Sequence, residues 1–568
     1  MNSELAKIFR ELAFLLEMKG VDFKPRAFEK AAASIEESSE DLARLYREGG
    51  PAALRTVPGI GAGIAERIEE YIKTGKIAEY EKLKHQLPVN VKDLSSIEGL
   101  GPKTILKLYK KLHVTDRAAL EAAIRSGKFR RKGFGEKTEQ NILKNIEFLK
   151  QSAGRLPLGA ALPIARGIIE TLRRVSGVAH ADVAGSLRRR QETIGDIDLL
   201  AASADPEKVM EFFTTMPQVA GVHEKGPTRS SVRLNIGLDA DLRVVPPEAF
   251  GAALQYFTGD KSHNIAVRQI AIKQGYKLNE YGLFKGEKLI AGKTEQEIYA
   301  ALGMDCPDPE IRTDEGEVEA ALKHELPELV GYKDIKGDLQ VHTEWSDGRY
   351  SIKEMAAAAR EFGHEYICIS DHTHSLAITG GMDENRLLEQ MAEIDRVQKE
   401  LPDIKILKGA EVNILKDGTL DLADEVLARL DVCGAAVHSH FNLSEKEMTA
   451  RIVRAIENPN VDILYHPTGR IIEKRAAYKV DIGAVIAAAR RTKTVLEIDG
   501  WPERLDLKDE HVRRAVTAGV KICIDTDSHS FEHFSYIEYG ISQARRGWAT
   551  KKDVINTRSW HELLKLLK

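Results

Sequence analysis

Residues 181–202 read ADVAGSLRRRQETIGDIDLLAA, so that two apolar runs flank a basic turn. The first run ends at Gly185–Ser186, where two small residues predict a tight turn. Three arginines, Arg188–Arg190, follow, and the second apolar run then carries Asp196 and Asp198. If that run is a strand, both carboxylates point to one face, because alternate residues of a strand share a face. We therefore expect paired acidic ligands beside a phosphate-sized turn.

A third carboxylate is expected from the segment LDADLRVV (238–245), where Asp239 and Asp241 are both candidates. Carboxylate oxygens suit hard cations such as Mg²⁺ or Mn²⁺. Two such ions about 3.5–4 Å apart would activate a primer hydroxyl and hold a triphosphate for phosphoryl transfer. Arg189 would then bind phosphate oxygens together with the glycine turn. The alternative is a surface strand with solvated aspartates, which leaves the basic turn unexplained.

The pattern GS…DID, followed by DLRVV and by LQYFTGDKSHNIAVR (254–268), resembles the nucleotidyltransferase superfamily and, more specifically, the family-X DNA polymerases. The resemblance implies a palm-type domain whose catalytic metal ligands are Asp196, Asp198 and Asp241. It implies contacts to the incoming deoxynucleotide from Gly185, Ser186, Arg189, Tyr256, Phe257, Gly259 and Asn264. It also implies that Arg268 lies near the template strand. Taken alone, the YFTG segment fits a buried aromatic turn equally well.

The N-terminal part of the chain carries one glycine pattern three times, at residues 57–68, 97–108 and 131–142. Each copy has Gly–apolar–Gly before a predicted helix, so exposed backbone N–H groups can bind a phosphate oxygen. Three copies favour binding to the DNA backbone without base readout over a purely structural helix–turn–helix. The copies resemble the helix-hairpin-helix motifs of DNA repair enzymes, which implies DNA contacts at Gly59, Gly61, Gly99, Gly101, Gly133 and Gly135.

Two residues near the first hairpin bear on a possible lyase reaction. In the polymerase-beta-type enzymes, a lysine of the first hairpin forms a Schiff base with an abasic sugar, and the matching position here is Arg67. A guanidinium stays protonated and cannot act as the amine nucleophile, so the resemblance does not predict lyase activity through Arg67. Lys24 is a candidate for binding a 5′-phosphate of DNA, and a solvated surface lysine is the alternative.

From Asp334 onward, short apolar runs alternate with predicted helices such as 351–362 and 384–400, which is typical of a parallel β/α sheet or barrel. Ionisable residues follow the apolar runs at His342 and Asp347, Asp371 and His372, Glu411, His438, His466, Glu497 and Asp499, and Asp527 and His529. Because the C-terminal ends of parallel barrel strands meet on one face, these groups are expected to share a site. Mixed imidazole and carboxylate ligands suit Zn²⁺, Mn²⁺ or Fe²⁺, and their number implies two or three ions.

This region resembles the PHP (polymerase and histidinol phosphatase) domain, a distorted barrel of seven strands with a trinuclear metal site. The resemblance implies the ligands His342, Asp347, His372, Glu411, His438, His466, Asp527 and His529. The family usually opens with His-x-His, whereas this chain has Gln340-Val341-His342. An amide is a weaker ligand than an imidazole, so we expect one ion to bind loosely or not at all. No role is assigned to His263, His364, His374, His440, His511 and His533.

Length and composition bound these interpretations. The chain has 568 residues, which predicts about four domains. A net charge of −4 excludes a histone-like basic protein and allows a local basic face. The 4 cysteines lack CxxC spacing, which argues against a disulfide framework or a zinc finger. No apolar stretch approaches the about 20 residues that span a bilayer. The charged, amphipathic start is unlike a signal peptide, so we expect a cytoplasmic, nucleoid-associated protein with no membrane partner.

The order of these features resembles bacterial and archaeal family-X DNA polymerases with a C-terminal PHP domain. The implied fold is multidomain α/β, with a helical N-terminal region and a distorted (β/α)7 barrel at the C-terminus. The implied domains are a helix-hairpin-helix domain (1–82), a fingers-like helix-hairpin-helix domain (83–153), a nucleotidyltransferase palm (154–246), a small thumb (247–313), a linker (314–333) and the PHP domain (334–568).

The implied activity is template-directed, gap-filling DNA synthesis in base excision repair. A monomer is expected to act on gapped or primer–template DNA with deoxynucleoside triphosphates, using Mg²⁺ or Mn²⁺ at the aspartates. The PHP domain, with Mn²⁺ and/or Zn²⁺, would act as a 3′–5′ exonuclease, and abasic-site endonuclease or 3′-phosphatase activity is a further option. One alternative is a small-molecule phosphatase anchored to DNA by its first half, which the three hairpins argue against. Another is a binding protein with degenerate catalysis, which the intact aspartate set argues against.

Overall fold

The computed structural model describes residues 1–21, 23–37, 42–57, 59–95, 97, 100–136, 138–140, 142–143, 146, 154–376 and 379–568. The chain divides into two units. The first comprises Met1–Ala153 with Glu473–Arg475, and the second comprises Gly154–Ile472 with Ala476–Lys568.

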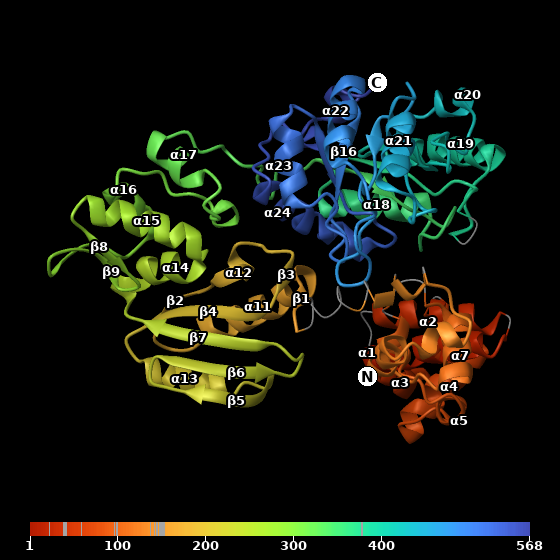
Figure 1. Ribbon diagram of the computed structural model, residues 1–568, viewed down its shortest axis with the longest axis horizontal. Helices are drawn as coiled ribbons and strands as arrows, with labels where there is room; N and C mark the ends of the chain where they lie inside the picture. Colours follow the sequence, from red (N-terminus) through yellow and green to blue (C-terminus); the bar gives the residue numbers. More distant parts are fainter. Residues whose placement is uncertain are drawn as a thin grey trace. The chain divides into compact units, whose positions relative to one another are not determined.

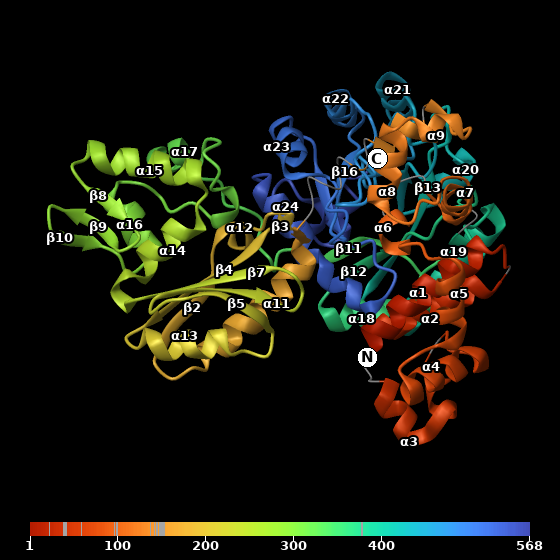
Figure 2. The ribbon, with the colours of Figure 1, turned by 60° about the horizontal axis from the view of Figure 1, so that its bottom comes forward.

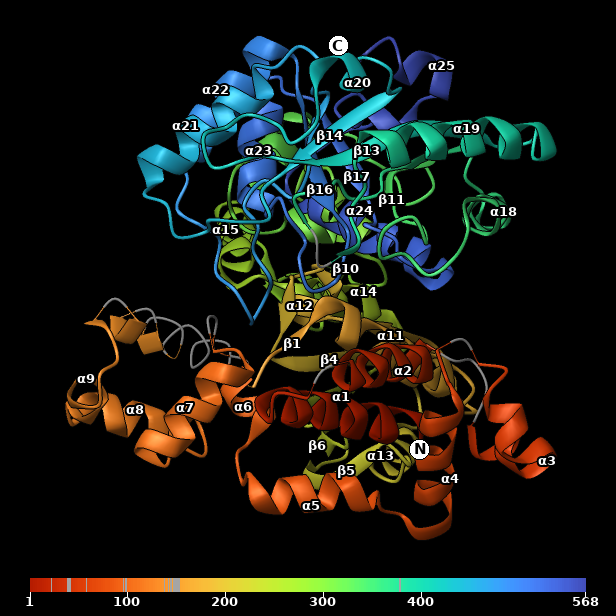
Figure 3. The ribbon, with the colours of Figure 1, turned by 90° about the vertical axis from the view of Figure 1, so that its right-hand side faces the viewer.

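The first unit is helical (Figure 3). Its described helices are α1 (Asn2–Met18), α2 (Lys24–Glu37), α3 (Leu42–Leu54), α4 (Ala62–Thr74), α5 (Ala78–Gln86), α6 (Val91–Ser95), α7 (Pro102–Leu112), α8 (Arg117–Arg125) and α9 (Lys128–Arg131). Helix α1 buries Leu5, Phe9 and Leu12 at helical spacing. Phe9 meets Phe28 of α2 edge-on, with ring centroids 5.3 Å apart, so the two helices share one core.

The second unit begins with a palm-like α/β region (Figure 1). Its elements are β1 (Leu156–Pro157), α11 (Leu158–Arg173), β2 (Val178–Val183), α12 (Gly185–Arg188), β3 (Thr193–Ile194), β4 (Asp196–Ser203), α13 (Pro206–Thr214), β5 (Val219–Lys225), β6 (Arg229–Leu234) and β7 (Asp239–Val245). Five strands form a sheet in the order β2-β4-β7-β6-β5, in which β4 and β7 run parallel. Helices α11 and α13 pack in one core with Ile197, Leu199 and Leu242, so the aspartates of β4 and β7 lie on the opposite face.

A smaller thumb-like region follows (Figure 2). Its elements are the 3-10 helix η1 (Pro247–Ala249), α14 (Phe250–Thr258), α15 (Lys261–Lys273), β8 (Lys277–Asn279), β9 (Gly282–Lys285), β10 (Lys288–Ala291), α16 (Glu295–Ala301), η2 (Pro309–Ile311) and α17 (Glu317–Lys323). Helix α17 lies in the segment expected to be a linker. Its residues Val318 and Ala321 belong to the thumb core, and the buried Glu317 contacts His263, with Oε1 2.6 Å from Nδ1. The first half of that segment is therefore part of the thumb-like fold.

The C-terminal region is a barrel of parallel strands, as predicted. The strands are β11 (Gly337–Val341), β12 (Tyr366–Ile369), β13 (Lys405–Asn413), β14 (Val432–Ala436), β15 (Ile463–Leu464), β16 (Val495–Asp499) and β17 (Ile522–Asp525). They pair in sequence order as a seven-stranded sheet. A parallel bridge between Val341 and Ser528 brings the first strand beside the end of the last, so the sheet nearly closes.

Helices surround this barrel. They are α18 (Ile352–Phe362), α19 (Glu384–Glu400), α20 (Asp424–Leu427), α21 (Glu445–Ile456), α22 (Ile482–Thr492), α23 (Asp509–Thr517), η4 (Phe531–Tyr536), α24 (Ile537–Arg546), η5 (Ile555–Thr557) and α25 (Trp560–Leu563). Capping boxes at Ser351 and Ser444 start α18 and α21. Within the part of the chain that the structure describes, no helix is both long and apolar enough to cross a bilayer.

Candidate active sites

Two adjacent strands of the palm-like sheet bring the predicted aspartates to one face. In the parallel pairing of β4 with β7, Asp196 stands opposite Asp239 and Asp198 opposite Asp241. Burial, followed by the charges of Asp196 and Asp241, raises the pKa of Asp198 to about 7. Such repulsion is what a divalent cation relieves, so this geometry supports a cation site at Asp198.

The structure separates the two candidates on β7. Asp239 is held by Arg233 and His223, whose Nε and Nε2 atoms lie 2.9 and 3.0 Å from its Oδ1. Asp241 has a looser contact, because Arg229 Nη2 lies 3.4 Å from its Oδ2. This difference favours Asp241 as the third ligand. The palm aspartates share a face but do not form a tight cluster. Among the described residues, groups of three or more potential metal ligands whose atoms lie within 4.8 Å of one another occur in the barrel.

The glycine turn lies directly against Asp198. Gly185 has a φ of +57°, and a Cβ atom added there would lie 1.8 Å from Asp198 Oδ2, so a larger residue cannot occupy this position unchanged. Arg189 Nη1 donates to the Thr258 carbonyl, while its buried Nε has no hydrogen-bond partner among the described residues. A buried guanidinium donor without a partner suits a phosphate oxygen. Ser186, at the same turn, is half-buried.

The aromatic pair predicted to contact the sugar lies at the end of α14. Tyr256 and Phe257 meet edge-on, 5.1 Å apart, and Arg268 lies 5.8 Å from the Tyr256 ring centroid. Asn264 Nδ2 donates to the Tyr256 carbonyl over 2.7 Å, so this side chain supports the aromatic turn. Gly259 has a φ of +70° and lies against the Arg189 guanidinium. These predicted nucleotide contacts therefore lie close to Arg189.

A buried ion-pair network joins this turn to the thumb-like region. Glu295 on α16 accepts from Arg188 Nη1 over 2.9 Å and from Arg312 Nη1 over 2.5 Å. Burial alone would raise the pKa of Glu295, but the two guanidiniums lower it to about 2. Arg188 also donates to Thr258 Oγ1 over 2.6 Å. Sequence patterns did not reveal this network, because Arg188 lies 107 residues from Glu295.

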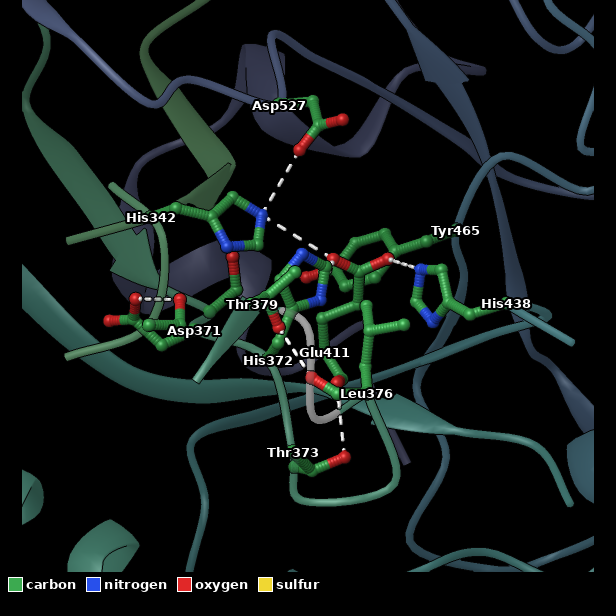
Figure 4. Close-up of polar contacts among 12 residues, drawn as sticks. His342, Asp371, His372, Thr373, Leu376, Thr379, Glu411, His438, Tyr465 and Asp527 are labelled. Atoms are coloured by element: carbon green, nitrogen blue, oxygen red, sulfur yellow. Dashed lines mark hydrogen bonds and ion pairs between the residues drawn. The ribbon is translucent and has the colours of Figure 1, made fainter. Parts of the chain in front are cut away.

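In the barrel, Glu411 lies at the centre of the predicted ligands (Figure 4). Its Oε1 lies 3.0 Å from His438 Nε2 and 2.7 Å from His466 Nε2. Its Oε2 lies 3.1 Å from His372 Nδ1 and 3.4 Å from His342 Nε2. Glu411 lies two residues before the end of β13 (Lys405–Asn413), and the histidines follow other strands of the barrel, so the strand-end placement predicted from sequence brings them together.

Asp347 and Asp527 complete the set on the His342 side. Asp527 Oδ1 lies 3.0 Å from His342 Nε2. Asp347 lies 3.4 Å from His529 Nε2 and 3.7 Å from His372 Nε2. The candidate metal-binding groups are His342, Asp347, His372 and His529; His372, Glu411 and His438; and His342, Glu411 and Asp527.

The chemistry of these atoms fits divalent cations. Several buried ligand atoms make no hydrogen bond of acceptable geometry among the described residues, although some lie only 3.0–3.1 Å from one another. They are His342 Nδ1 and Nε2, His372 Nδ1, Glu411 Oε2, His466 Nδ1 and Asp527 Oδ1. Buried polar groups normally find partners, so this convergence indicates ligands for an ion. Gln340 is also fully buried, and both its amide atoms lack a partner. The residues present therefore fit a metal centre.

Further side chains orient the ligands. Asn413 Oδ1 lies 2.7 Å from His438 Nδ1, so the Nδ1–H tautomer turns Nε2 toward Glu411. Asp371, which follows β12 with His372, accepts instead from Thr343 Oγ1 over 2.6 Å and from Gln390 Nε2 over 2.6 Å. No sequence motif pointed to Asn413, although it follows Glu411 by two residues.

Two other strand-end carboxylates lie outside the metal-binding groups. Glu497 Oε2 accepts from the His466 backbone N–H over 2.5 Å. Asp499 pairs with Arg504, whose Nε lies 3.3 Å from Asp499 Oδ2 and 3.8 Å from Asp527 Oδ2. Arg504 therefore supplies positive charge beside the acidic ligands, and no sequence motif pointed to it.

In the first unit, glycines stand at the predicted hairpins. Gly61 precedes α4 and Gly101 precedes α7, both as N-cap residues. Gly59 and Gly133 have φ values of +80° and +82°, which supports turns at these positions, and Gly135 is exposed. Gly99 lies outside the described residues. Lys24 and Arg67 both pair with Glu79, over 3.3 and 2.9 Å, which places the predicted 5′-phosphate ligand Lys24 near the residue that replaces the usual Schiff-base lysine.

Four family models match the chain in the predicted order. They are "Helix-hairpin-helix domain" (residues 1–77), "SAM-like Helix-hairpin-helix tandem" (91–147), "DNA polymerase beta thumb" (253–313) and "PHP domain" (338–489).

Curated relatives support the same organisation. The chain is 39% identical to the DNA polymerase/3′-5′ exonuclease PolX of Bacillus subtilis (strain 168), covering 100% of this chain and 99% of that protein. It is 24% identical to DNA polymerase lambda of Arabidopsis thaliana over 55% of this chain and 62% of that protein. A probable phosphatase of Thermoanaerobacter sp. (strain X514) is 30% identical over 39% of this chain and 89% of that protein. The full-length match and the domain order confirm the predicted family: the chain belongs to the family-X DNA polymerases with a C-terminal PHP domain.

Proposed function

We propose that this chain is a template-directed DNA polymerase that also carries a metal-dependent 3′–5′ exonuclease. The observation that carries the proposal is the presence of two separate ligand sets in one chain. One is an all-carboxylate set beside a phosphate-sized turn, and the other is a histidine-rich set around Glu411. The full-length relative that is named a DNA polymerase/3′-5′ exonuclease supports both assignments.

In the polymerase site, Asp196, Asp198 and Asp241 would hold Mg²⁺ or Mn²⁺, which lowers the pKa of a primer hydroxyl and neutralises the triphosphate. Arg189 and the Gly185–Ser186 turn bind the phosphate oxygens through a guanidinium and backbone N–H groups. The aromatic turn at the end of α14 restricts the space beside the sugar and so favours deoxynucleotides. Arg268 contacts the template strand.

In the barrel, the eight predicted ligands would hold Mn²⁺ and/or Zn²⁺, which supplies a hydroxide near neutral pH and binds the scissile phosphate. Asn413 keeps the ring of His438 oriented with Nε2 toward the site. Gln340 offers an amide where an imidazole is usual, so the ion nearest to it binds more weakly than the others. Abasic-site endonuclease or 3′-phosphatase activity would use the same groups.

Gapped or primer–template DNA and deoxynucleoside triphosphates are the proposed substrates, and gap filling in base excision repair is the proposed role. The glycine turns of the first unit, including Gly101 and Gly135, bind the DNA backbone, and Lys24 binds a 5′-phosphate. Arg67 provides no Schiff-base chemistry. The protein acts as a monomer in the cytoplasm, at the nucleoid.

The polymerase assignment is tested with Asp198→Ala on one-nucleotide-gapped DNA. Incorporation should fall by about 10²–10³-fold or more, because the central carboxylate of the set is removed, while DNA binding and nuclease activity remain. The matched control is Asp239→Asn, on the same face of β7 but already paired with Arg233, which should change incorporation by no more than about threefold. Equal incorporation by Asp198→Ala and the parent protein removes the assignment. Comparing Mg²⁺ with Mn²⁺ in the same gel identifies the preferred ion.

The nuclease assignment is tested with His342→Ala on a 3′-recessed duplex. Digestion should stop while synthesis continues, whereas His561→Ala, an exposed histidine of the same domain, should behave like the parent. Unchanged digestion by His342→Ala contradicts the assignment. A second candidate, a small-molecule phosphatase, is favoured by the similarity of the barrel region to a probable phosphatase. Faster hydrolysis of histidinol phosphate than of the duplex would support that candidate.

A further inference from the structure

Helix α24 of the PHP domain contacts the glycine turn of the palm-like region within the second unit. Glu538 Oε1 lies 3.3 Å from Arg190 Nη2 at the end of that turn. The same carboxylate accepts from Arg166 Nη1 of α11 over 2.8 Å. At the other end of α24, Arg546 Nη1 donates to the backbone carbonyl of Arg189 over 3.2 Å. The residue proposed to bind the triphosphate is thus held by a side chain from the nuclease domain.

The turn ends in a left-handed residue that is contacted from outside the palm-like sheet. Arg190 has a φ of +54°, a left-handed conformation that is unfavourable for a residue with a Cβ atom. Such a conformation persists where surrounding contacts hold it. Within the turn, the Arg190 N–H donates to the Leu187 carbonyl over 3.1 Å. From outside the turn, the Arg190 side chain contacts Glu538 through the ion pair and lies 5.7 Å from the ring centroid of Tyr332. Neither of these side-chain contacts comes from the palm-like sheet.

The two regions meet through packing as well as through charge. Ile472, Leu505 and Tyr539, all from the barrel region, belong to the hydrophobic core of the palm-like sheet. A Cβ atom added at Gly159 of α11 would lie 2.4 Å from Pro502 Cβ, so the α11 backbone packs directly against the Pro502 ring. These contacts make α24 a fixed support for the turn.

We propose that α24 is a positioning element for the polymerase site, with Glu538 and Arg546 as the positioning residues. Arg546 fixes the Arg189 carbonyl, and Glu538 holds Arg190 in its left-handed conformation. Together they aim the Arg189 guanidinium at the triphosphate. The affinity for the incoming nucleotide therefore depends on the PHP domain, although the proposed nuclease site of that domain is separate from the polymerase site. This inference rests on the nucleotide-binding role proposed for Arg189.

The test compares Glu538→Gln with Arg166→Gln in the full-length protein, at saturating gapped DNA. Both variants weaken the ion pairing between the two regions, but Arg166 does not contact the turn. Glu538→Gln should raise KM for the nucleotide about three- to fivefold and leave kcat within about twofold, which is the range for a partly exposed ion pair. Arg166→Gln and the nuclease rate of both variants should stay within about twofold of the parent. The proposal is overturned if KM rises equally in both variants or rises in neither of them.

Hydrogen exchange of the turn provides a readout that does not depend on catalysis. The amides of Arg188, Arg189 and Gln191 are bonded within the turn, and they should exchange faster in Glu538→Gln than in Arg166→Gln. Arg546→Lys should accelerate the same amides, because one ammonium cannot reproduce the guanidinium contacts. Unchanged exchange in these two α24 variants refutes positioning by α24. If these amides exchange faster in the α24 variants but the parent protein incorporates no nucleotide, the proposed polymerase function is wrong and the positioning by α24 is not.

Discussion

His364 should make the stability of the PHP domain depend on pH, and His364→Phe should remove that dependence. This histidine follows α18, and its ring lies between Phe362 and Phe534, with centroid distances of 5.2 and 5.6 Å. It is 6% exposed, and its Nε2 has no hydrogen-bond partner among the described residues. Burial lowers its pKa to about 4, because the charged ring cannot be hydrated there.

The size of the effect follows from linkage. In the unfolded chain the His364 ring has a pKa of about 6.5, so between pH 6.5 and 4 the unfolded state binds a proton that the folded state does not. The free energy of unfolding must therefore fall as the pH is lowered through this window. From pH 7 to pH 5 the expected loss from this one group is about 2 kcal/mol. A phenylalanine has no proton to bind and fits between two aromatic rings, so the variant should lack this loss.

Urea unfolding at pH 7 and pH 5 measures the difference. Other titrating groups contribute equally to both proteins, so the parent should lose about 2 kcal/mol more than His364→Phe. His561→Phe is the matched control, because this exposed histidine stacks on Trp560 and is hydrated in both states. The reasoning is refuted if the parent and His364→Phe lose the same free energy over this pH range.

Three further predictions concern the two sites. Glu295→Ala should reduce the free energy of unfolding by about 3–5 kcal/mol, because it leaves the buried guanidinium of Arg312 and the half-buried guanidinium of Arg188 uncompensated. In the same urea assay, replacing an exposed glutamate of α16 should cost little. Asn413→Ala should weaken metal binding by about 10–100-fold, because the His438 ring loses its orienting acceptor; equilibrium dialysis with metal analysis measures this, and unchanged affinity would contradict that role. Gly185→Ala should reduce nucleotide incorporation by about 10²-fold, because its Cβ atom displaces the Asp198 carboxylate, while nuclease activity on a 3′-recessed duplex stays at the parent level; normal incorporation would show that the turn can relax.

Local patterns in the sequence predicted much of the fold. The two-residue spacing of Asp196 and Asp198 predicted one acidic strand face, because side-chain direction alternates along any strand. The alternation of short apolar runs with helices predicted a parallel sheet or barrel, and the resemblance to the PHP domain predicted the barrel of seven strands that the structure has. The strand-end positions of His342 and Glu411 likewise predicted their meeting, because parallel strands end on the same face.

Other features were decided by contacts between distant segments. Residue type and spacing left Asp239 and Asp241 both open, and the family resemblance selected Asp241. The cross-strand partner Arg233 then shows that Asp239 is already paired. Residues 314–333 were expected to link two domains, but Glu317 docks on His263 and fixes α17 to the thumb-like core.

Local sequence patterns therefore specify which residues share a strand face or a strand end, because these properties follow from the local periodicity of the chain. Tertiary structure decided which charges are compensated and which groups orient the ligands. Arg546 reaches the carbonyl of Arg189 across 357 positions, and no local pattern encodes such a pair. The partner of a buried polar group is set by the packing of whole elements, so it is known only once the chain has folded.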